Sequence, residues 1–573
     1  MNKKYRNILF CVPLAVVFLF FSCATSSSTP SSGEGEIVSV NISKKGNKNY
    51  FSGIDSHIMD LIESGSPHNI KQAYSLLHKV TEDEYTEKEK ILVSLCDSLM
   101  KILWPSEDYS FEVPSEIISN PYTGAVESAL RGIYDSSTGN SDFLSTILPS
   151  LVLVTSDSRN DYFDSSLAAL TECQKIHPDS VMVNYLLGIL YLKENQSESA
   201  LNCFTLCQKT CGDNYEILYG QCRAFFQLNQ FEKCLSIADS VLEKNPQNLD
   251  MLELAAKSTY GLNNLEKSES YVIRILLLEP ENLEYVLFRA KILVDKGDYI
   301  RASSLLDVYS RSNDTSRDYL LLRAKLQRDW NKNYNASLET ITKAVNLYPE
   351  DYDVLLYACE IASLTNSKIN GKTALEIANQ LLIDNPKNVD VMKISVKEMI
   401  RQNQWNSAYE LSSKIIRENP GDSEMIYSHA DICLSLKKYD EAMNLASKMY
   451  NQNPNDTDAQ QCYIKTLVKT GQNAQALSLI NQLLPKSSSK MKSFLYYERS
   501  FFASTEDDVL ADLRGSLTAN PRNNDSLYRL YEIYYGKKDW RRAQYYLKQV
   551  LSNDPSNEDV MKKVSELDSL LGK

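Results

Sequence analysis

The chain has 573 residues, of which 43% are apolar and 24% are charged, and its formal net charge at pH 7 is −13. This acidic balance argues against a nucleic-acid partner, which requires a basic face, and against broad binding to anionic lipid. Glycine (19) and proline (17) are few beside 35 tyrosines, which excludes a loop-rich or low-complexity chain.

The first residues have the pattern of an export signal. A basic start precedes an apolar run over residues 8–21, which is short for a membrane span of about 20 residues. The run leads into Phe-Phe-Ser-Cys, ending at Cys23, which resembles the lipobox of bacterial lipoproteins. The resemblance implies a signal peptide over 1–22 and a lipid on Cys23. Phe21 is bulkier than the residue usual there, so an uncleaved anchor and an ordinary signal peptide are the alternatives.

A flexible tether is expected after Cys23. Residues 24–36 are rich in serine and glycine and offer almost nothing to bury, which favours a solvated chain. We therefore expect a lipidated cysteine and a tether over 23–50. The expected location is the bacterial cell envelope, where the protein would be exported and membrane-anchored as a lipoprotein, facing the periplasm or in the outer membrane.

Residues 51–145 are predicted to form an irregular helical region. Apolar residues recur at helical spacing over 70–80, 87–103 and 125–134, and Trp-Pro follows the second of these helices. No motif of a known catalytic centre occurs here. An enzyme with its catalytic site in residues 51–145 is therefore only a remote alternative.

The rest of the chain repeats at intervals close to 34 residues or twice that number. Prolines mark the period at Pro178, Pro246, Pro280, Pro349, Pro386, Pro420, Pro454, Pro521 and Pro555. Small residues keep the same phase, at Gly188, Cys222, Ala256, Ala290, Ala324, Cys359 and Ala430, and again at Ala200, Cys234, Ser268, Ala302, Ser337, Ala374, Ala408, Ala442, Ala476 and Ala543. Each unit reads as a helix, a tight turn, a second helix and a stop, and neither helix could bury its apolar face alone.

This pattern resembles the tetratricopeptide repeat family. Within one repeat the matching residues are Tyr185, Leu187, Gly188, Tyr191, Ala200 and Phe204. The resemblance implies an all-α fold, a right-handed α-solenoid of about twelve helix-turn-helix repeats over residues 146–556. Residues 557–573 carry an apolar face that would close the array as a C-terminal capping helix.

In that family the first helices of successive repeats line a groove that binds protein or peptide partners. Carried onto this sequence, the ninth repeat position is basic at Arg223, Lys257, Lys291, Lys325, Lys397, Lys465 and Arg499. The fifth and twelfth positions supply the aromatic residues Tyr185, Tyr219, Tyr427, Tyr528, Phe226, Tyr260, Phe502 and Tyr535. Cations beside aromatic faces could bind an extended peptide that carries acidic groups.

A second interpretation of the same residues is structural. The second repeat position is acidic at Glu216, Asp250, Glu284, Asp318, Asp353, Asp390, Glu424, Asp458 and Asp525. Acids in the first turn of a helix stabilise it by about 0.3–1 kcal/mol, and they could also neutralise basic residues of a neighbouring repeat. The basic line is then either a binding groove or a charge ladder without a ligand.

The sequence predicts neither catalysis nor a cofactor. The five histidines are scattered, and His429 reads as a packed core or groove residue. Cys203, Cys207 and Cys211 share a helix face but have no histidine nearby, so no metal site is predicted, while a disulfide within 203–234 stays open. We expect a lipid-anchored protein-interaction scaffold, with an accessory subunit of an envelope assembly or secretion machine as the alternative.

Overall fold

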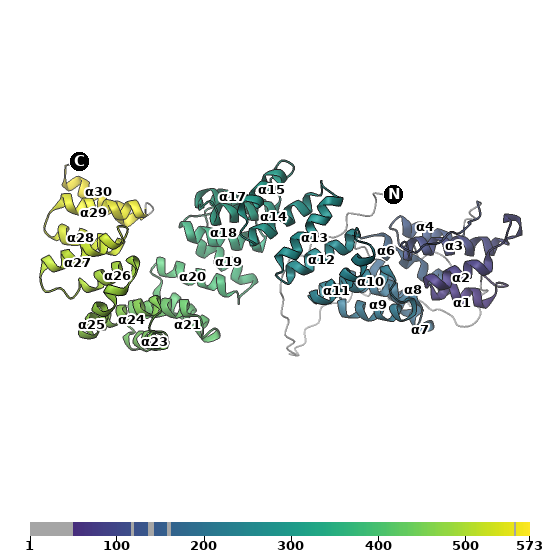
Figure 1. The fold of residues 1–573 in the computed structure, drawn as a ribbon, viewed down its shortest axis with the longest axis horizontal. Helices are drawn as coiled ribbons and strands as arrows, with labels where there is room; N and C mark the ends of the chain where they lie inside the picture. The colour runs from purple at the N-terminus through teal and green to yellow at the C-terminus, as the bar shows by residue number, and fades with distance from the viewer. Residues whose placement is uncertain (1–49, 116–119, 136–141, 158–161, 555–556, 573) are drawn as a thin grey trace, which may run out of the picture. The chain divides into compact units, whose positions relative to one another are not determined.

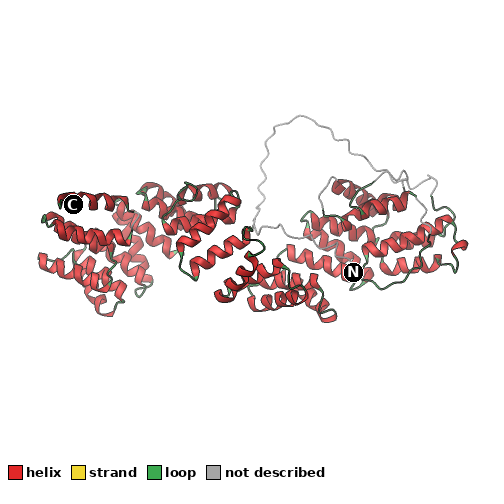
Figure 2. Ribbon diagram, turned by 90° about the horizontal axis from the view of Figure 1, so that it is seen from above, coloured by secondary structure: helices red, strands yellow, loops and turns green. Residues whose placement is uncertain are grey.

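The computed structural model describes residues 50–572 apart from 116–119, 136–141, 158–161 and 555–556. The expected signal peptide, Cys23 and all but the last residue of the expected tether lie outside the described residues. The described chain forms helices and two isolated β-bridges but no strand (Figures 1 and 2). It divides into two compact units, Met1–Asp298 and Tyr299–Lys573. No described helix has both the length and the apolar character needed to cross a membrane.

The first unit begins with short helices and continues with helix pairs. Its elements are α1 (Ser56–Ser64), α2 (Pro67–Leu77), η1 (Glu82–Glu84), α3 (Glu87–Leu103), α4 (Pro121–Leu130), α5 (Phe143–Ile147), η2 (Leu148–Leu151), α6 (Val152–Thr155), α7 (Tyr162–Ile176), α8 (Val181–Lys193), α9 (Ser197–Cys211), α10 (Tyr215–Gln227), α11 (Phe231–Lys244), α12 (Leu249–Gly261), α13 (Leu265–Leu278) and α14 (Leu283–Asp295).

The second unit consists of helix pairs closed by a single helix. Its elements are α15 (Tyr299–Ser310), α16 (Arg317–Asp329), α17 (Tyr334–Leu347), α18 (Tyr352–Thr365), α19 (Ala374–Asp384), α20 (Val389–Arg401), α21 (Trp405–Glu418), α22 (Ser423–Ser435), α23 (Tyr439–Gln452), α24 (Thr457–Lys469), α25 (Asn473–Leu483), η3 (Leu484–Lys486), α26 (Ser489–Arg499), α27 (Glu506–Ala519), α28 (Asn524–Gly536), α29 (Trp540–Asn553) and α30 (Glu558–Leu570).

This arrangement is the all-α solenoid of tetratricopeptide type that the repeat period predicts. The expected helix at 125–134 instead occupies Pro121–Leu130, because Asn120 caps it and Pro121 suits its first position. The first expected repeat is broken into α5, η2, α6 and α7. The capping helix is present as α30, which packs on α29 and buries Val560, Val564 and Leu567.

The periodic prolines separate one pair from the next. Before Pro420, α21 ends at Glu418, and two residues after the proline the Asp422 carboxylate accepts the backbone N–H of Met425. The same spacing places Asn248, Asp351 and Asn388 as side-chain caps after their prolines. Proline thus stops one helix and an Asn or Asp two residues later starts another.

The small residues lie where the two helices of a pair cross. Cys222, Ala256, Ala290, Ala324, Cys359 and Ala430 on first helices, and Ala200, Cys234, Ser268, Ala302, Ser337, Ala408, Ala442, Ala476 and Ala543 on second helices, are fully buried. A Cβ atom at Gly188 would lie 2.7 Å from the Phe204 ring. A larger side chain at these positions would therefore push the helices apart.

The turns inside most pairs have a left-handed residue that the sequence reading did not single out; the turn between α26 and α27 has none. Positive φ angles recur at Asn195, Asn229, Asn263, Gly297, Lys332, Asn366, Asn403, Lys437, Gly471 and Lys538. These positions follow the repeat period, and most hold asparagine or glycine, the residues that adopt this conformation at least cost.

The N-terminal helices share their core with the first repeats. One apolar cluster contains Ile62, Leu99 and Trp104 from the N-terminal region together with Leu186 and Phe204 from α8 and α9. The expected boundary at residues 145 and 146 falls inside α5. The N-terminal region is therefore packed against the array, and its helices hold one end of it in place.

Candidate functional site

The first helices of successive pairs lie next to one another and form a continuous face within each unit. In the first unit α8 contacts α10 and α10 contacts α12, while in the second α16 contacts α18, α18 contacts α20, and α22 contacts α24. The predicted groove residues belong to first helices of pairs between α8 and α28, except Phe502, which follows α26. Within each unit the predicted residues on these helices thus share the first-helix side of the pairs.

The chain itself covers the beginning of this face in the first unit. Trp104, directly after α3, is fully buried, and its ring lies 4.9 Å from that of Tyr185 on α8. The segment after Trp104 also contacts a first helix. The backbone N–H and the hydroxyl of Ser106 both donate to the Glu216 carboxylate of α10, each at 2.8 Å. Tyr185 and Glu216 therefore contact the protein's own N-terminal region.

Arg223 and Lys257 have partners inside the protein. The Arg223 guanidinium lies 5.6 Å from the ring centroid of Tyr219, and burial raises the pKa of that tyrosine. Lys257 Nζ lies 2.5 Å from a carboxylate oxygen of Glu253, one turn earlier on α12. Their charges are thus partly compensated within α10 and α12.

Lys291 and Tyr260 combine a cation with an aromatic ring. Lys291 Nζ on α14 lies 4.9 Å from the ring centroid of Tyr260 on α12. The Tyr260 hydroxyl donates to Asp295 at 2.6 Å, and burial, reinforced by this carboxylate, raises the pKa of the phenol. This contact joins neighbouring first helices.

In the second unit several predicted groove residues form structural ion pairs. Lys465 Nζ lies 2.9 Å from Asp431, which occupies the same repeat position one pair earlier. Arg499 binds Asp512 of α27, with its closest contact at 2.5 Å. These two basic residues follow the charge-ladder interpretation, although the acids come from other repeat positions than the second.

The two predicted tyrosines of this unit are also hydrogen-bonded. The Tyr427 hydroxyl donates to Asp456 at 2.8 Å, and Lys563 of α30 donates to the Tyr528 hydroxyl at 2.6 Å. Within the described residues neither Lys325 nor Lys397 forms an ion pair. Like Arg223 and Lys291, which contact tyrosine rings, these lysines have no carboxylate partner within the described residues.

Lys397 lines a hollow of about 410 Å³ on the face of the first helices. The lining comes from α16, α18, α20 and α22 and consists of Arg328, Glu360, Ser363, Leu364, Lys393, Ile394, Val396, Lys397, Ile400, Glu424, Met425 and Ser428. Leu364 is 49% exposed and Lys397 is also exposed. An apolar wall and an ammonium group are thus open to solvent side by side.

The other charges of this hollow are fixed by ion pairs. Arg328 lies 3.0 Å from Glu360 across α16 and α18, and Lys393 lies 2.6 Å from Asp422. The hydrogen bond to Asp422 raises the pKa of Lys393. Because its neighbours are paired, Lys397 is the group that can offer a new charge-assisted hydrogen bond here.

The sequence reading found Lys397 but not the apolar half of the hollow. Leu364 follows the twelfth repeat position, one residue beyond the register used for the groove, and Ile394 and Ile400 look like ordinary core residues in the helical pattern. Whether apolar residues on several first helices are exposed depends on the curvature of the helix stack. The sequence does not give this curvature.

Family comparison supports tetratricopeptide repeats in the middle of the second unit. Residues 434–489 match the family model described as tetratricopeptide repeat. Residues 367–448 match the model described as anaphase-promoting complex, cyclosome, subunit 3. The two matched segments overlap over residues 434–448, at the end of α22 and in α23. A comparison with curated proteins finds no match.

Solved structures with helical repeats align with the chain at low identity. A tetratricopeptide repeat protein from Parabacteroides merdae is 19% identical over 50% of this chain and 98% of its own, with a TM-score of 0.34. Pseudomonas aeruginosa pilF is 14% identical over 38% and 97%, with a TM-score of 0.32. Yeast Tom70 is 14% identical over 74% and 95%, with a TM-score of 0.33.

Proposed function

We propose that this protein is a non-catalytic scaffold that binds an extended segment of a partner protein on the first-helix face of its second unit. The observation that carries the proposal is the hollow between α16 and α22, where exposed Leu364 adjoins the unpaired ammonium of Lys397. A partner segment with an apolar side chain next to a carboxylate would pack against Leu364 and form an ion pair with Lys397. The match of residues 434–489 to the tetratricopeptide repeat model supports this function.

Binding in this hollow is tested by site-specific crosslinking in the producing cell. A photoreactive amino acid at position 364 should capture a partner protein. Lys397→Glu should weaken that capture about tenfold or more, because it replaces a charge-assisted hydrogen bond by repulsion.

Lys414→Glu is the matched control for this experiment. Lys414 is exposed on α21, a second helix, and is not among the residues that line the hollow. The same change of charge there should leave the captured amount unchanged. Equal losses in both variants would mean that net charge and not the hollow decides binding, and undiminished capture in Lys397→Glu would contradict the proposal.

We also propose that the scaffold is lipid-anchored in the bacterial cell envelope through Cys23. The supporting observations are sequence features: the basic start, the apolar run and the cysteine that follows it. Cys23→Ser should abolish incorporation of labelled fatty acid and release the protein from the membrane fraction. Cys96→Ser, which changes a buried cysteine of α3, should retain the label. Unchanged labelling in Cys23→Ser would rule the anchor out.

A further inference from the structure

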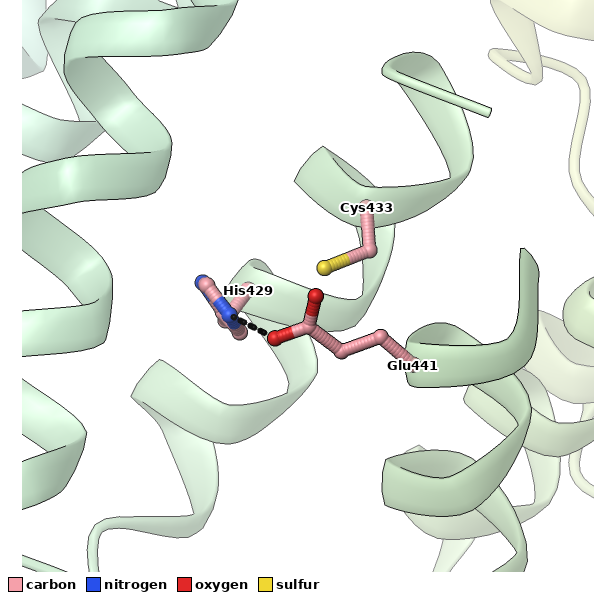
Figure 3. Close-up of side chains that lie close together, drawn as sticks. All are labelled: His429, Cys433 and Glu441. Carbon is pink, nitrogen blue, oxygen red and sulfur yellow. Dashed lines mark hydrogen bonds and ion pairs between the residues drawn. The ribbon is translucent and has the colours of Figure 1, made fainter. Parts of the chain in front are cut away.

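Three side chains with metal-binding groups converge between the two helices of one pair. His429 and Cys433 lie four residues apart on α22, and Glu441 lies in the first turn of α23. Their potential ligand atoms all lie within 4.8 Å of one another. Figure 3 shows the imidazole, the sulfur atom and the carboxylate pointing into the same space.

The hydrogen bond between His429 and Ser412 leaves Nε2 available for a metal in one tautomer of the ring. The Ser412 hydroxyl lies 2.6 Å from the carbonyl oxygen of Ala408 and 2.7 Å from His429 Nδ1. When the hydroxyl donates to Ala408, its oxygen accepts the Nδ1 proton, and the lone pair of the neutral ring is then on Nε2.

This lone pair faces a carboxylate. His429 Nε2 lies 3.4 Å from Oε1 of Glu441, and the imidazole is almost completely buried. In this tautomer the Nε2 lone pair and the carboxylate face each other, and a cation between them would satisfy both.

Neighbouring side chains hold both ligands in place. The Tyr409 hydroxyl donates to the two Glu441 carboxylate oxygens at 3.2 and 3.0 Å, and its ring stacks on His429 with centroids 4.9 Å apart. Ser412 fixes the imidazole from the opposite side. Hydrogen bonds of this kind orient the ligands of metal sites and raise their affinity.

The spacing and the ligand types fit one class of metal. Nitrogen and oxygen ligands about 2.0–2.2 Å from zinc at a tetrahedral angle are about 3.4 Å apart, which is the separation between His429 Nε2 and Glu441 Oε1. Imidazole and thiolate favour zinc and related ions over magnesium and calcium. A divalent ion with one thiolate and one carboxylate is also electrically neutral, which suits a site whose imidazole and thiol are buried.

We propose that His429, Cys433 and Glu441 bind a zinc-type divalent cation that links α22 to α23. The imidazole binds through Nε2 and the carboxylate through one oxygen. The Cys433 thiol loses its proton to water as the metal–sulfur bond forms, and a water molecule completes four ligands. Lys438, whose ammonium lies 3.4 Å from the Tyr409 ring centroid, is exposed and remains in solvent.

The proposal is tested with the purified, reduced full-length chain and cobalt(II) as a spectroscopic probe. One equivalent of cobalt should give the visible bands of a tetrahedral site and a thiolate-to-cobalt charge-transfer band, and zinc should displace it. Cys433→Ala should remove the charge-transfer band, and Glu441→Gln should weaken zinc binding about tenfold or more. Glu441 is 41% exposed, so the second variant keeps its fold.

Cys359→Ala is the matched control, because Cys359 is equally buried in the same unit and lies outside the cluster. It should bind cobalt with the spectrum of the unchanged protein. A charge-transfer band that persists in Cys433→Ala, or zinc affinity that is the same in Glu441→Gln and the unchanged chain, would overturn the proposal. So would the absence of any thiolate band.

Discussion

Glu498 on α26 is a glutamate at a position where most repeats have a small residue. It falls on the period of Ala290, Ala324 and Ala430, and its side chain is 5% exposed. Burial raises its pKa to about 7, although Lys465 opposes the shift. Because the folded pKa is raised, the protonated carboxyl contributes its full stability below about pH 4.5, and that contribution is lost as the pH rises toward 7.

Glu498→Gln should therefore stabilise the protein at pH 8 and have little effect at pH 4. The neutral amide avoids the cost of a buried charge, so we expect a gain on the order of 2 kcal/mol at the higher pH. Thermal unfolding and hydrogen exchange of α26 at both pH values measure it.

Glu398→Gln is the control, and its expected effect on stability at pH 8 is opposite to that of Glu498→Gln. Glu398 is also buried, but it accepts two hydrogen bonds from Arg401, at 2.8 and 2.9 Å, and one from Ser363 at 2.6 Å. Its replacement removes the carboxylate partner of Arg401, which keeps only the longer contacts to Asn366 and Ser363, and should destabilise the fold at pH 8. A stabilised Glu398→Gln, or a Glu498→Gln equally stable to the unchanged chain at pH 8, would contradict this account.

At the same scale, two cysteines illustrate what a repeat pattern can and cannot reveal. Cys222 and Cys234 occupy the small positions of one pair, so the sequence predicts their burial. The distance of 3.0 Å between their sulfur atoms follows only from the crossing of α10 and α11. The thiols are free in the structure, as are Cys203, Cys207 and Cys211, and the question of a disulfide in this region stays open.

Among the elements, the turns inside most pairs contain a residue in a left-handed conformation. Lys437, between α22 and α23, has a φ of 59°, and Gly471 has a φ of 75° in the following turn. A side chain in this conformation costs about 1–2 kcal/mol, so lysine is strained where glycine is not. The requirement is local to the turn and can be tested without touching the core.

Lys437→Gly should raise the unfolding temperature, because relief of backbone strain outweighs the greater freedom of the unfolded chain. The expected gain in the free energy of unfolding is up to about 1 kcal/mol. Gly471→Ala should lower the free energy of unfolding by about the same amount. A Cβ atom at Gly471 has no heavy atom within 4 Å, so backbone strain alone would act there. Shifts in the same direction for the two variants would contradict this explanation.

The helices were predictable because their signals are local. Proline ends α21, an Asx cap starts α22, and small residues mark the crossing, each within a few residues of sequence. The N-terminal region was less predictable. The start of α4 depends on the Asn120 cap, and the packing of the region depends on contacts such as that between Ser106 and Glu216. Ser106 and Glu216 are far apart in the sequence, and the repeat period does not predict their contact.

The candidate hollow was predictable only in part, for a similar reason. The ninth repeat position led to Lys397, which lines the hollow on the first-helix face. Which basic residues are already paired depends on their neighbours, as Lys465 with Asp431 and Arg499 with Asp512 illustrate. The sequence alone could not separate these pairs from unpaired lysines such as Lys325 and Lys397.

At the scale of the whole molecule, α30 covers the last pair of the array. Its Val560 and Leu567 belong to one apolar cluster with Leu547 and Val550 of α29. Deletion of residues 557–573 should expose this cluster and cause association that increases with protein concentration, measured by sedimentation velocity.

Met561→Ser is the control for the deletion, since Met561 is 41% exposed on the outer side of the same helix. This variant should sediment as the unchanged chain does. A truncated protein that also sediments like the unchanged chain at every concentration would show that α30 is not needed to close the array.

The N-terminal helices pack onto α8 and α9 and cover the first pairs of the array, as α30 covers the last pair. Both terminal pairs are covered by segments of the same polypeptide, so neither is free to continue its stacking onto a second molecule. The number of pairs that face a partner is then fixed by translation and not by assembly. The stoichiometry of partner binding should accordingly be constant from dilute to concentrated protein.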